Sequence, residues 1–218
     1  MQRMTQNPPQ LPMHALFDAQ YQASRAQIDV PLALRRERLR RLKHLIEHHG
    51  KELSAAIEAD FGVRSRHLTE VADLFVLRSL LSHLNKHLPR WMRPVKVATP
   101  VYLKPASATI QRQPLGVVGV ISPWNYPVQL AFGPAATALA AGNRVMLKPS
   151  ELTARTSALM AELVHGVFDA DEFCVVQGDA SVAARFAGLP FDHLFFTGST
   201  AVGRKVAAEA ANNLTPTT

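Results

Sequence analysis

Apolar residues in the first ninety positions recur every three or four residues, which is the spacing of amphipathic helices. One such series predicts a helix that starts near Pro31 and ends at Gly50, with Leu32, Leu39, Leu42, Leu45 and Ile46 on its apolar face. We expect further helices over 14–27, 51–60 and 69–88, the last capped by Thr69. Residues 1–12 are polar and bear prolines, which predicts a disordered lead-in to a helical region over 13–99.

Prolines then break the helical pattern. Pro89, Pro94, Pro100 and Pro105 follow one another at short intervals, and each removes a backbone donor that a helix needs. Segments 101–103 and 108–113 have extended character between these prolines. We interpret residues 100–113 as a hairpin.

From residue 114 the pattern changes to short, continuous apolar runs. Runs at 116–121, 144–148, 173–177 and 193–197 predict four strands, with helices over 128–141, 154–167, up to residue 186 and over 201–211. This alternation predicts an α/β fold with a doubly wound, mostly parallel, Rossmann-like sheet over 114–218. Because ligands of such sheets bind at the carboxyl ends of the strands, the turns SPWN, KPSE, QGD and TGST should share one edge.

The positive charge of the chain belongs to its helical half. Residues 1–113 hold 18 Lys and Arg against 9 Asp and Glu, whereas residues 114–218 hold 6 against 8. The basic run from Arg35 to Arg41 suits either a nucleic-acid contact or the solvated face of an amphipathic helix. No aromatic residue interrupts the run and no nucleic-acid motif accompanies it, so we expect a solvated face and no nucleic-acid partner.

The sequence HLIEH, from His44 to His48, matches a zinc-protease pattern, H-x-x-E-H. At about 100° per residue both histidines point away from the apolar face, beside Arg40 and Arg41. Neighbouring cations oppose a bound dication, so we expect no metal site.

The single cysteine, Cys174, excludes a disulfide framework within the chain and a zinc cage of several thiolates. It lies in the apolar run FCVVQ, and we expect it to be buried and inert. The chain has no apolar run long enough to span a membrane and no secretory signal, so we expect a cytoplasmic protein.

Three of the predicted turns carry candidate chemistry, and each has an ordinary structural alternative. The segment GSTAVG, from Gly198 to Gly203, suits a pyrophosphate site or a capped helix. Lys148 and Glu151 suit the hydroxyls of a ribose, or a solvated lysine beside a helix start. Asn125 could donate its amide to an oxyanion, or serve as a turn residue.

Taken together, GVVGVISPWNYP, AGNRVMLKPSE and FDHLFFTGSTAVG resemble, in that order, the coenzyme domain of aldehyde dehydrogenases, from about Ala15 to Thr218. Within that family, DFGVRSRH, RWMRP and ISPWNYP are most similar to the coniferyl-aldehyde branch, near class 3. The resemblance implies oxidation of an aromatic or aliphatic aldehyde to the carboxylic acid. It also implies a homodimer when the enzyme is full length.

The same resemblance implies roles for individual residues. Asn125 would donate to the oxyanion, and the pyrophosphate would lie against the turn that holds Ser199. The coenzyme contacts would come from Ile121, Ser122, Trp124, Lys148, Ser150, Glu151, Gly178, Gly198, Ser199 and Gly203. NAD is favoured, with NADP as the alternative, because Glu151 would repel a 2′-phosphate while Lys148 would attract it.

The family's general-base glutamate lies in an ELGGK motif and its nucleophilic cysteine in a G-Q-x-C context, and neither occurs in these 218 residues. We therefore expect a truncated chain that is inactive alone. The alternative is a non-catalytic module that binds nucleotide or docks onto other subunits.

Overall fold

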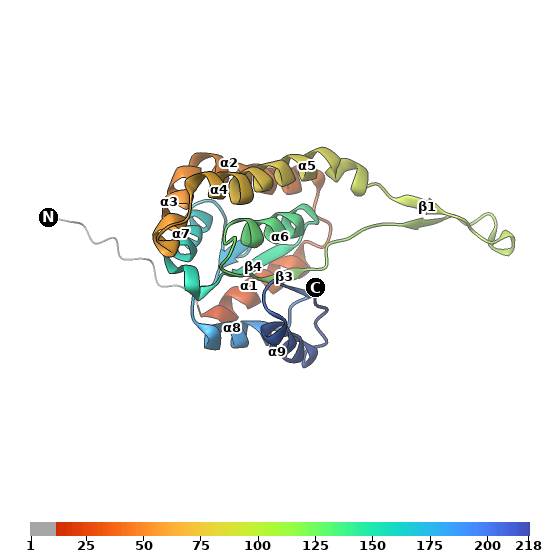
Figure 1. Ribbon diagram of the computed structural model, residues 1–218. Helices are drawn as coiled ribbons and strands as arrows, with labels where there is room; N and C mark the ends of the chain where they lie inside the picture. The colour runs from red at the N-terminus through yellow and green to blue at the C-terminus, as the bar shows by residue number, and fades with distance from the viewer. Residues whose placement is uncertain (1–11) are drawn as a thin grey trace.

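The computed structural model describes residues 12–218. The expected lead-in over 1–12 lies outside the described residues, apart from Pro12, which precedes the first helix, α1 (Met13–Ala26). The chain forms a helical layer, a central sheet between helices, and a projecting hairpin (Figure 1).

The helical layer contains α2 (Leu32–His48) and α3 (Gly50–Phe61), followed by one continuous helix. Gly50 does not end α2 but begins α3, so that expectation was wrong. A Cβ at Gly50 would lie 3.1 Å from an Arg78 guanidinium nitrogen and 3.3 Å from a Leu74 methyl, so glycine lets this corner pack closely. Gly62, at φ 77°, ends α3 as expected.

The continuous helix consists of α4 (Arg66–Thr69), a π-helical segment, η1 (Glu70–Phe75), and α5 (Val76–Trp91). Thr69 is therefore a buried interior residue and not the expected cap, because the helix starts earlier. Pro89 does not stop the helix at once either, and the disruption that it causes falls in the last turn, just before α5 ends at Trp91.

The wide turn of η1 shifts the inward-facing positions by one residue. Leu74, Leu77, Leu81 and Leu84 keep the regular spacing of three or four residues, whereas Thr69 is buried five residues before Leu74. Glu70 consequently lies outside, where its carboxylate pairs with Arg78.

The projecting hairpin pairs β1 (Val95–Val97) with β2 (Ala108–Ile110) in antiparallel fashion, and it extends away from the body of the molecule (Figure 1). A hairpin in this region was expected, but its first strand was placed wrongly. Residues Val101–Leu103 form a 3-10 turn, η2, at its tip. Both strands are exposed, so no alternation of buried positions marked them.

The main sheet contains β3 (Val117–Ile121), β4 (Arg144–Lys148), β5 (Phe173–Val175) and β6 (His193–Phe196). Its order is β5-β4-β3-β6 and all its pairs are parallel. The helices α6 (Gln129–Ala140), α7 (Ala154–His165), α8 (Ala180–Ala187) and α9 (Thr200–Ala211) connect or follow these strands. The doubly wound parallel sheet is therefore confirmed. The strand order reverses between β3 and β6, which is where such sheets bind ligands.

Helices cover both faces of this sheet. The face that includes Val118 and Val120 packs on α6, α7 and the helical layer. The other face, which includes Val117 and Ile121, packs on α1, α8 and α9. Pro216 and Thr218 exchange backbone hydrogen bonds with Leu194 and Phe196, so the last residues run parallel along the outer side of β6.

The basic run of α2 is only partly a solvated face. Arg35 is buried and donates to the carbonyls of Val30 and Ala141 at 2.8 and 2.7 Å. Arg38 is buried as well, and its Nε lies 3.0 Å from Glu172. These two arginines bind the helical layer to the sheet layer, which a reading of charge alone did not reveal.

His44 and His48 are exposed as expected. Over residues 12–218 we find no group of three or more metal-ligating side chains. Within the same range no helix is long and apolar enough to cross a membrane.

Candidate functional site

The turns after β3, β4 and β6 lie at one level because their strands end in register. Ile121 is paired with Lys148 on one side and with Phe196 on the other. The Ser122 amide donates to the Lys148 carbonyl, and the Thr197 amide donates to the Ile121 carbonyl, both at 3.1 Å. The shared edge predicted from the sequence is therefore present at the point where the strand order reverses.

Lys148 ends β4 with a buried side chain, only 1% exposed. Its Nζ donates to the Pro149 carbonyl at 2.7 Å and lies 3.5 Å from a Glu151 carboxylate oxygen. Burial lowers the pKa of Lys148, and the charge of Glu151 opposes this shift. The alternative of a solvated lysine is therefore wrong, whereas the pairing with Glu151 is present.

Ser150 fixes the turn between Lys148 and Glu151. Its hydroxyl accepts a hydrogen bond from the Leu152 amide at 3.2 Å, at the start of the short helix η3 (Glu151–Thr153). Its carbonyl accepts from the Ser157 hydroxyl at 2.9 Å. The Ser150 side chain thus holds the turn, and Glu151 remains 44% exposed beside it.

Gly178 follows β5 with a φ of 148°. A Cβ at this position would lie 2.4 Å from a Val182 methyl. Asp179 then caps α8, where its carboxylate accepts from the amides of Ser181 and Val182. The position requires glycine for backbone reasons, whether or not a ligand lies near it.

Gly198, Ser199 and Gly203 surround the N-terminus of α9. The Ser199 hydroxyl accepts from the Val202 amide at 3.4 Å. A Cβ at Gly198 would lie 2.5 Å from the Phe196 ring, and one at Gly203 would lie 3.2 Å from the same ring. The Phe196 ring therefore packs against this turn. The sequence did not reveal this role, because Phe196 looked like an ordinary strand residue.

The turn after β3 presents Trp124 and Asn125 to the surface. Trp124 is 49% exposed, and its ring centroid lies 5.9 Å from that of Phe61 in α3. Asn125 is exposed, while Ser122 at the base of the turn is buried and its hydroxyl has no hydrogen-bond partner within residues 12–218. Ile121 is buried in the sheet, so only its backbone lies at this edge.

Two residues that the sequence did not single out hold this turn. Arg64 donates to the Asn125 carbonyl and pairs with Asp73 at 2.8 Å. Asp73 also accepts from the amides of Val128 and Gln129 at 3.3 and 3.1 Å. A carboxylate on the apolar side of a predicted helix was the signal that could have revealed them.

A model of the aldehyde dehydrogenase family matches residues 11–218. The chain belongs to this family. The resemblance seen in the sequence motifs is therefore confirmed.

Among curated aldehyde dehydrogenases, coniferyl aldehyde dehydrogenase from Pseudomonas sp. (strain HR199 / DSM 7063) is 49% identical over 189 residues, which are 86% of this chain and 38% of that protein. Probable coniferyl aldehyde dehydrogenase from Pseudomonas aeruginosa is 43% identical over 206 residues, which are 94% of this chain and 43% of that protein. The chain thus spans about two fifths of the length of these relatives.

Solved structures agree with this assignment. The substrate-bound state of Staphylococcus aureus AldH has a TM-score of 0.91 and 31% identity, covering 95% of this chain and 45% of that one. PnpE in complex with nicotinamide adenine dinucleotide has a TM-score of 0.81 and 26% identity, covering 93% of this chain and 41% of that one.

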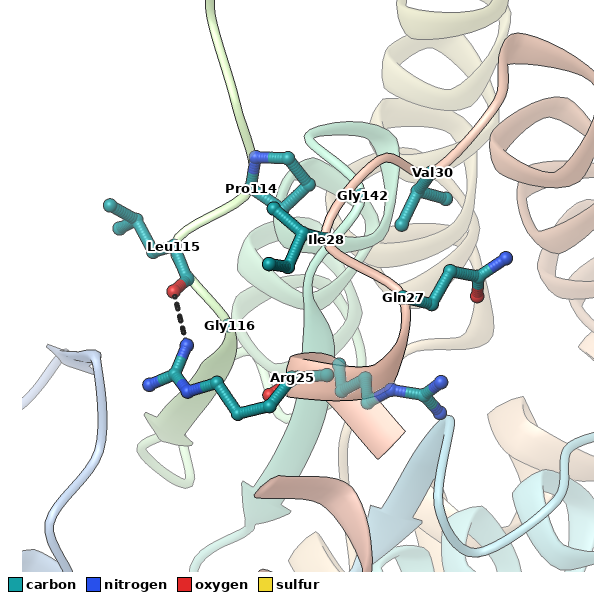
Figure 2. Close-up of a pocket in the computed structure, with 10 residues that line it drawn as sticks. Arg25, Gln27, Ile28, Val30, Pro114, Leu115, Gly116 and Gly142 are labelled. Carbon is teal, nitrogen blue, oxygen red and sulfur yellow. Dashed lines mark hydrogen bonds between the residues drawn. The ribbon is translucent and has the colours of Figure 1, made fainter. Parts of the chain in front are cut away.

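Two hollows of this aldehyde dehydrogenase chain lie at the other end of the sheet. One, of about 30 Å³, lies between Gly116 before β3, Gly142 before β4, and the end of α1, where Arg25 donates to the Leu115 carbonyl at 3.2 Å (Figure 2). That volume suits a water molecule and not a dinucleotide. The other, of about 570 Å³, lies beside Pro190 and Asp192, before β6. Neither coincides with the edge that carries Lys148 and Asn125.

Cys174 lies in β5 and is 8% exposed. Burial raises the pKa of its thiol to about 12. The expected burial of Cys174 is confirmed, while its inertness stays a prediction that the raised pKa of the thiol supports.

Proposed function

We propose that this chain is the coenzyme-binding part of an NAD-dependent dehydrogenase that oxidises a coniferyl-type aromatic or an aliphatic aldehyde to the carboxylic acid. The supporting observation is the register of β3, β4 and β6, which brings the turns of Asn125, Lys148 and Ser199 to one edge. The substrate class rests on the coniferyl aldehyde dehydrogenases among its relatives. We also propose a cytoplasmic homodimer for the whole enzyme.

The residues at this edge fit a dinucleotide. Lys148 is a buried ammonium that donates to the Pro149 carbonyl, and Glu151 beside it offers a carboxylate, so the pair presents both a donor and an acceptor to vicinal hydroxyls. The N-terminus of α9 at Ser199 offers backbone amides and a positive dipole end to a pyrophosphate. Gly198 and Gly203 let this turn pack closely against the Phe196 ring. NAD, when bound, supplies the hydride acceptor.

The other proposed roles divide by position along the edge. Trp124, with the backbone of Ile121 and Ser122, would line the nicotinamide side, and Gly178 would border the adenine. Asn125 would donate its amide to the oxygen of the aldehyde as negative charge develops there. Its exposed position at the end of β3 leaves the amide free to do so.

A charge-removing variant of Glu151 tests the preference for NAD. The negative charge of Glu151 would repel a 2′-phosphate close to it. Because Glu151 is 44% exposed, solvent would partly screen this repulsion. We expect Glu151→Gln to raise the affinity for NADP relative to NAD by about tenfold, the equivalent of about 1.4 kcal/mol. Calorimetric titration with both coenzymes measures this ratio.

Glu162→Gln, on the exposed side of α7, is the matched control and should leave the ratio unchanged. If Glu151→Gln also leaves the ratio unchanged, Glu151 does not face the ribose and the assignment of this turn is wrong.

A non-catalytic nucleotide-binding module is the second candidate, because the one thiol of these 218 residues, Cys174, is buried in β5. We expect the purified 218-residue chain to form no NADH from coniferyl aldehyde and NAD, followed by absorbance at about 340 nm. Cys174→Ser should behave identically. Aldehyde-dependent NADH formation that disappears in Cys174→Ser would contradict the inert assignment.

A further inference from the structure

Arg64 and Asp73 form a buried ion pair next to the turn that carries Asn125. Their side chains are 6% and 0% exposed, and Arg64 Nη2 lies 2.8 Å from Asp73 Oδ2. Buried pairs of this kind seldom add much stability over apolar residues of the same size, because both charges must leave water. The position of this pair therefore invites an explanation beyond stability.

Asp73 holds the C-terminal end of the turn. Its second oxygen, Oδ1, accepts from the backbone amides of Val128 and Gln129 at 3.3 and 3.1 Å, where α6 begins. These amides have no partner within the helix, and a carboxylate is the acceptor that a helix N-terminus favours. Asp73 reaches them from η1, whose wide turn sets its direction.

Arg64 holds the middle of the turn. Its Nη1 donates to the backbone carbonyl of Asn125 itself. The guanidinium carbon lies 4.9 Å from the ring centroid of Phe61 and 5.0 Å from that of Tyr126, so aromatic rings limit its movement. The Arg64 guanidinium thus joins the Asn125 peptide to the Asp73 carboxylate, which accepts hydrogen bonds from the amides at the start of α6.

We propose that Arg64 and Asp73 are positioning residues, which fix the backbone of the turn over 122–128 so that the Asn125 amide points toward the reacting aldehyde. The inference rests on the proposed oxyanion role of Asn125. An exposed amide in a free turn would sample many directions, and effective transition-state donors are held within about 0.5 Å of their productive position. Arg64 supplies that restraint through its hydrogen bond to the Asn125 carbonyl.

The first test measures the turn without any catalysis. Trp91 and Trp124 are the two tryptophans of the chain, so Trp91→Phe leaves Trp124 as a reporter within the turn. In this background we expect Arg64→Gln to increase the amplitude of nanosecond motion of Trp124, measured by time-resolved fluorescence anisotropy. Arg66→Gln is the matched control. Arg66 lies two positions after Arg64 in the sequence, and its ion pair with Glu58 is exposed.

Arg64→Lys guards against misfolding. Lysine keeps the charge beside Asp73 but lacks the planar fork that joins two acceptors. We expect it to loosen Trp124 while circular dichroism stays unchanged. If Trp124 moves no more in Arg64→Lys and Arg64→Gln than in Arg66→Gln, the positioning role is refuted.

The second test measures catalysis in a complete aldehyde dehydrogenase polypeptide that contains these residues. We expect Arg64→Gln to lower kcat by about 10²-fold, the effect of a misplaced catalytic group, with an unchanged KM for NAD. The double variant Arg64→Gln/Asn125→Ala should be no slower than Asn125→Ala alone. Independent, multiplying losses would overturn the proposal.

The two hypotheses fail in different ways. If Asn125→Ala retains full kcat, the oxyanion role in the proposed function is wrong, and with it the catalytic purpose of the restraint. If Asn125→Ala is inactive but Arg64→Gln retains full kcat, the oxyanion role stands and the positioning inference alone is refuted.

Discussion

Glu172→Gln is expected to destabilise the folded chain by about 3 kcal/mol, because it leaves a buried cation without its counter-charge. Glu172 lies 3.0 Å from the Nε of Arg38 and 2.8 Å from Arg41, and Arg38 is 1% exposed. One further nitrogen of Arg38, Nη1, is already buried and has no hydrogen-bond partner in the part of the chain that the structure describes. Urea unfolding followed by circular dichroism measures the loss.

The same variant should change the response to acid. Burial would raise the pKa of Glu172, but hydrogen bonds from Arg41 and Arg38 outweigh it, and the pKa lies below its ordinary value of 4.5. A lowered pKa contributes stability that is present above the unfolded value and lost as the pH falls through the folded value. The difference in the free energy of unfolding between the parent chain and Glu172→Gln should therefore become smaller as the pH falls below 4.5.

Glu47→Gln provides the matched control for Glu172. Glu47 pairs with Lys43 at 3.7 Å on the exposed side of α2. Exposed pairs contribute about 0.5 kcal/mol, so this variant should unfold almost as the parent does. Equal effects at both positions would show that Glu172 does not hold the helical layer to the sheet.

Lys148→Met is expected to weaken NAD binding by at least about tenfold, since it removes the charge-assisted hydrogen bonds that we propose Lys148 donates to the ribose hydroxyls. Stability should not fall in parallel. The ammonium is buried, its desolvation opposes folding, and methionine fills a similar volume without that penalty. Ligand-observed NMR titration with NAD measures the affinity, and thermal unfolding measures the stability.

Lys51→Met, at the exposed start of α3, controls for the loss of one positive charge. It should leave NAD affinity unchanged. If Lys148→Met binds NAD as well as Lys51→Met does, Lys148 serves only to join Pro149 and Glu151, and the ribose assignment is incorrect.

The sheet could be predicted well from the sequence, because strands that are buried on both faces appear as short, continuous apolar runs. Residues Arg144–Lys148 form β4 over the predicted range, since a short apolar run between two turns has few other solutions. The strands of the hairpin show no such apolar run. Both of its strands are exposed, and the expected first strand lay several residues after the true one, Val95–Val97.

The candidate site was predictable where its residues follow strands, and not where they come from distant segments. Lys148 and Ser199 could be placed because strand ends in a parallel sheet share an edge. Arg64 and Asn125 are 61 positions apart, and no periodicity relates them. Arg38 looked like one cation in a solvated series, because its counter-ion, Glu172, lies far along the chain.

The π-helical segment Glu70–Phe75 makes chain length in this helix matter. If one residue were removed from it, a regular α-helix would form with one position fewer, and the residues on its two sides would rotate relative to each other. Asp73 or Thr69 would then leave the interior, and Glu70 would turn toward apolar neighbours. An alignment of relatives over residues 70–75 should therefore show substitutions far more often than single-residue deletions.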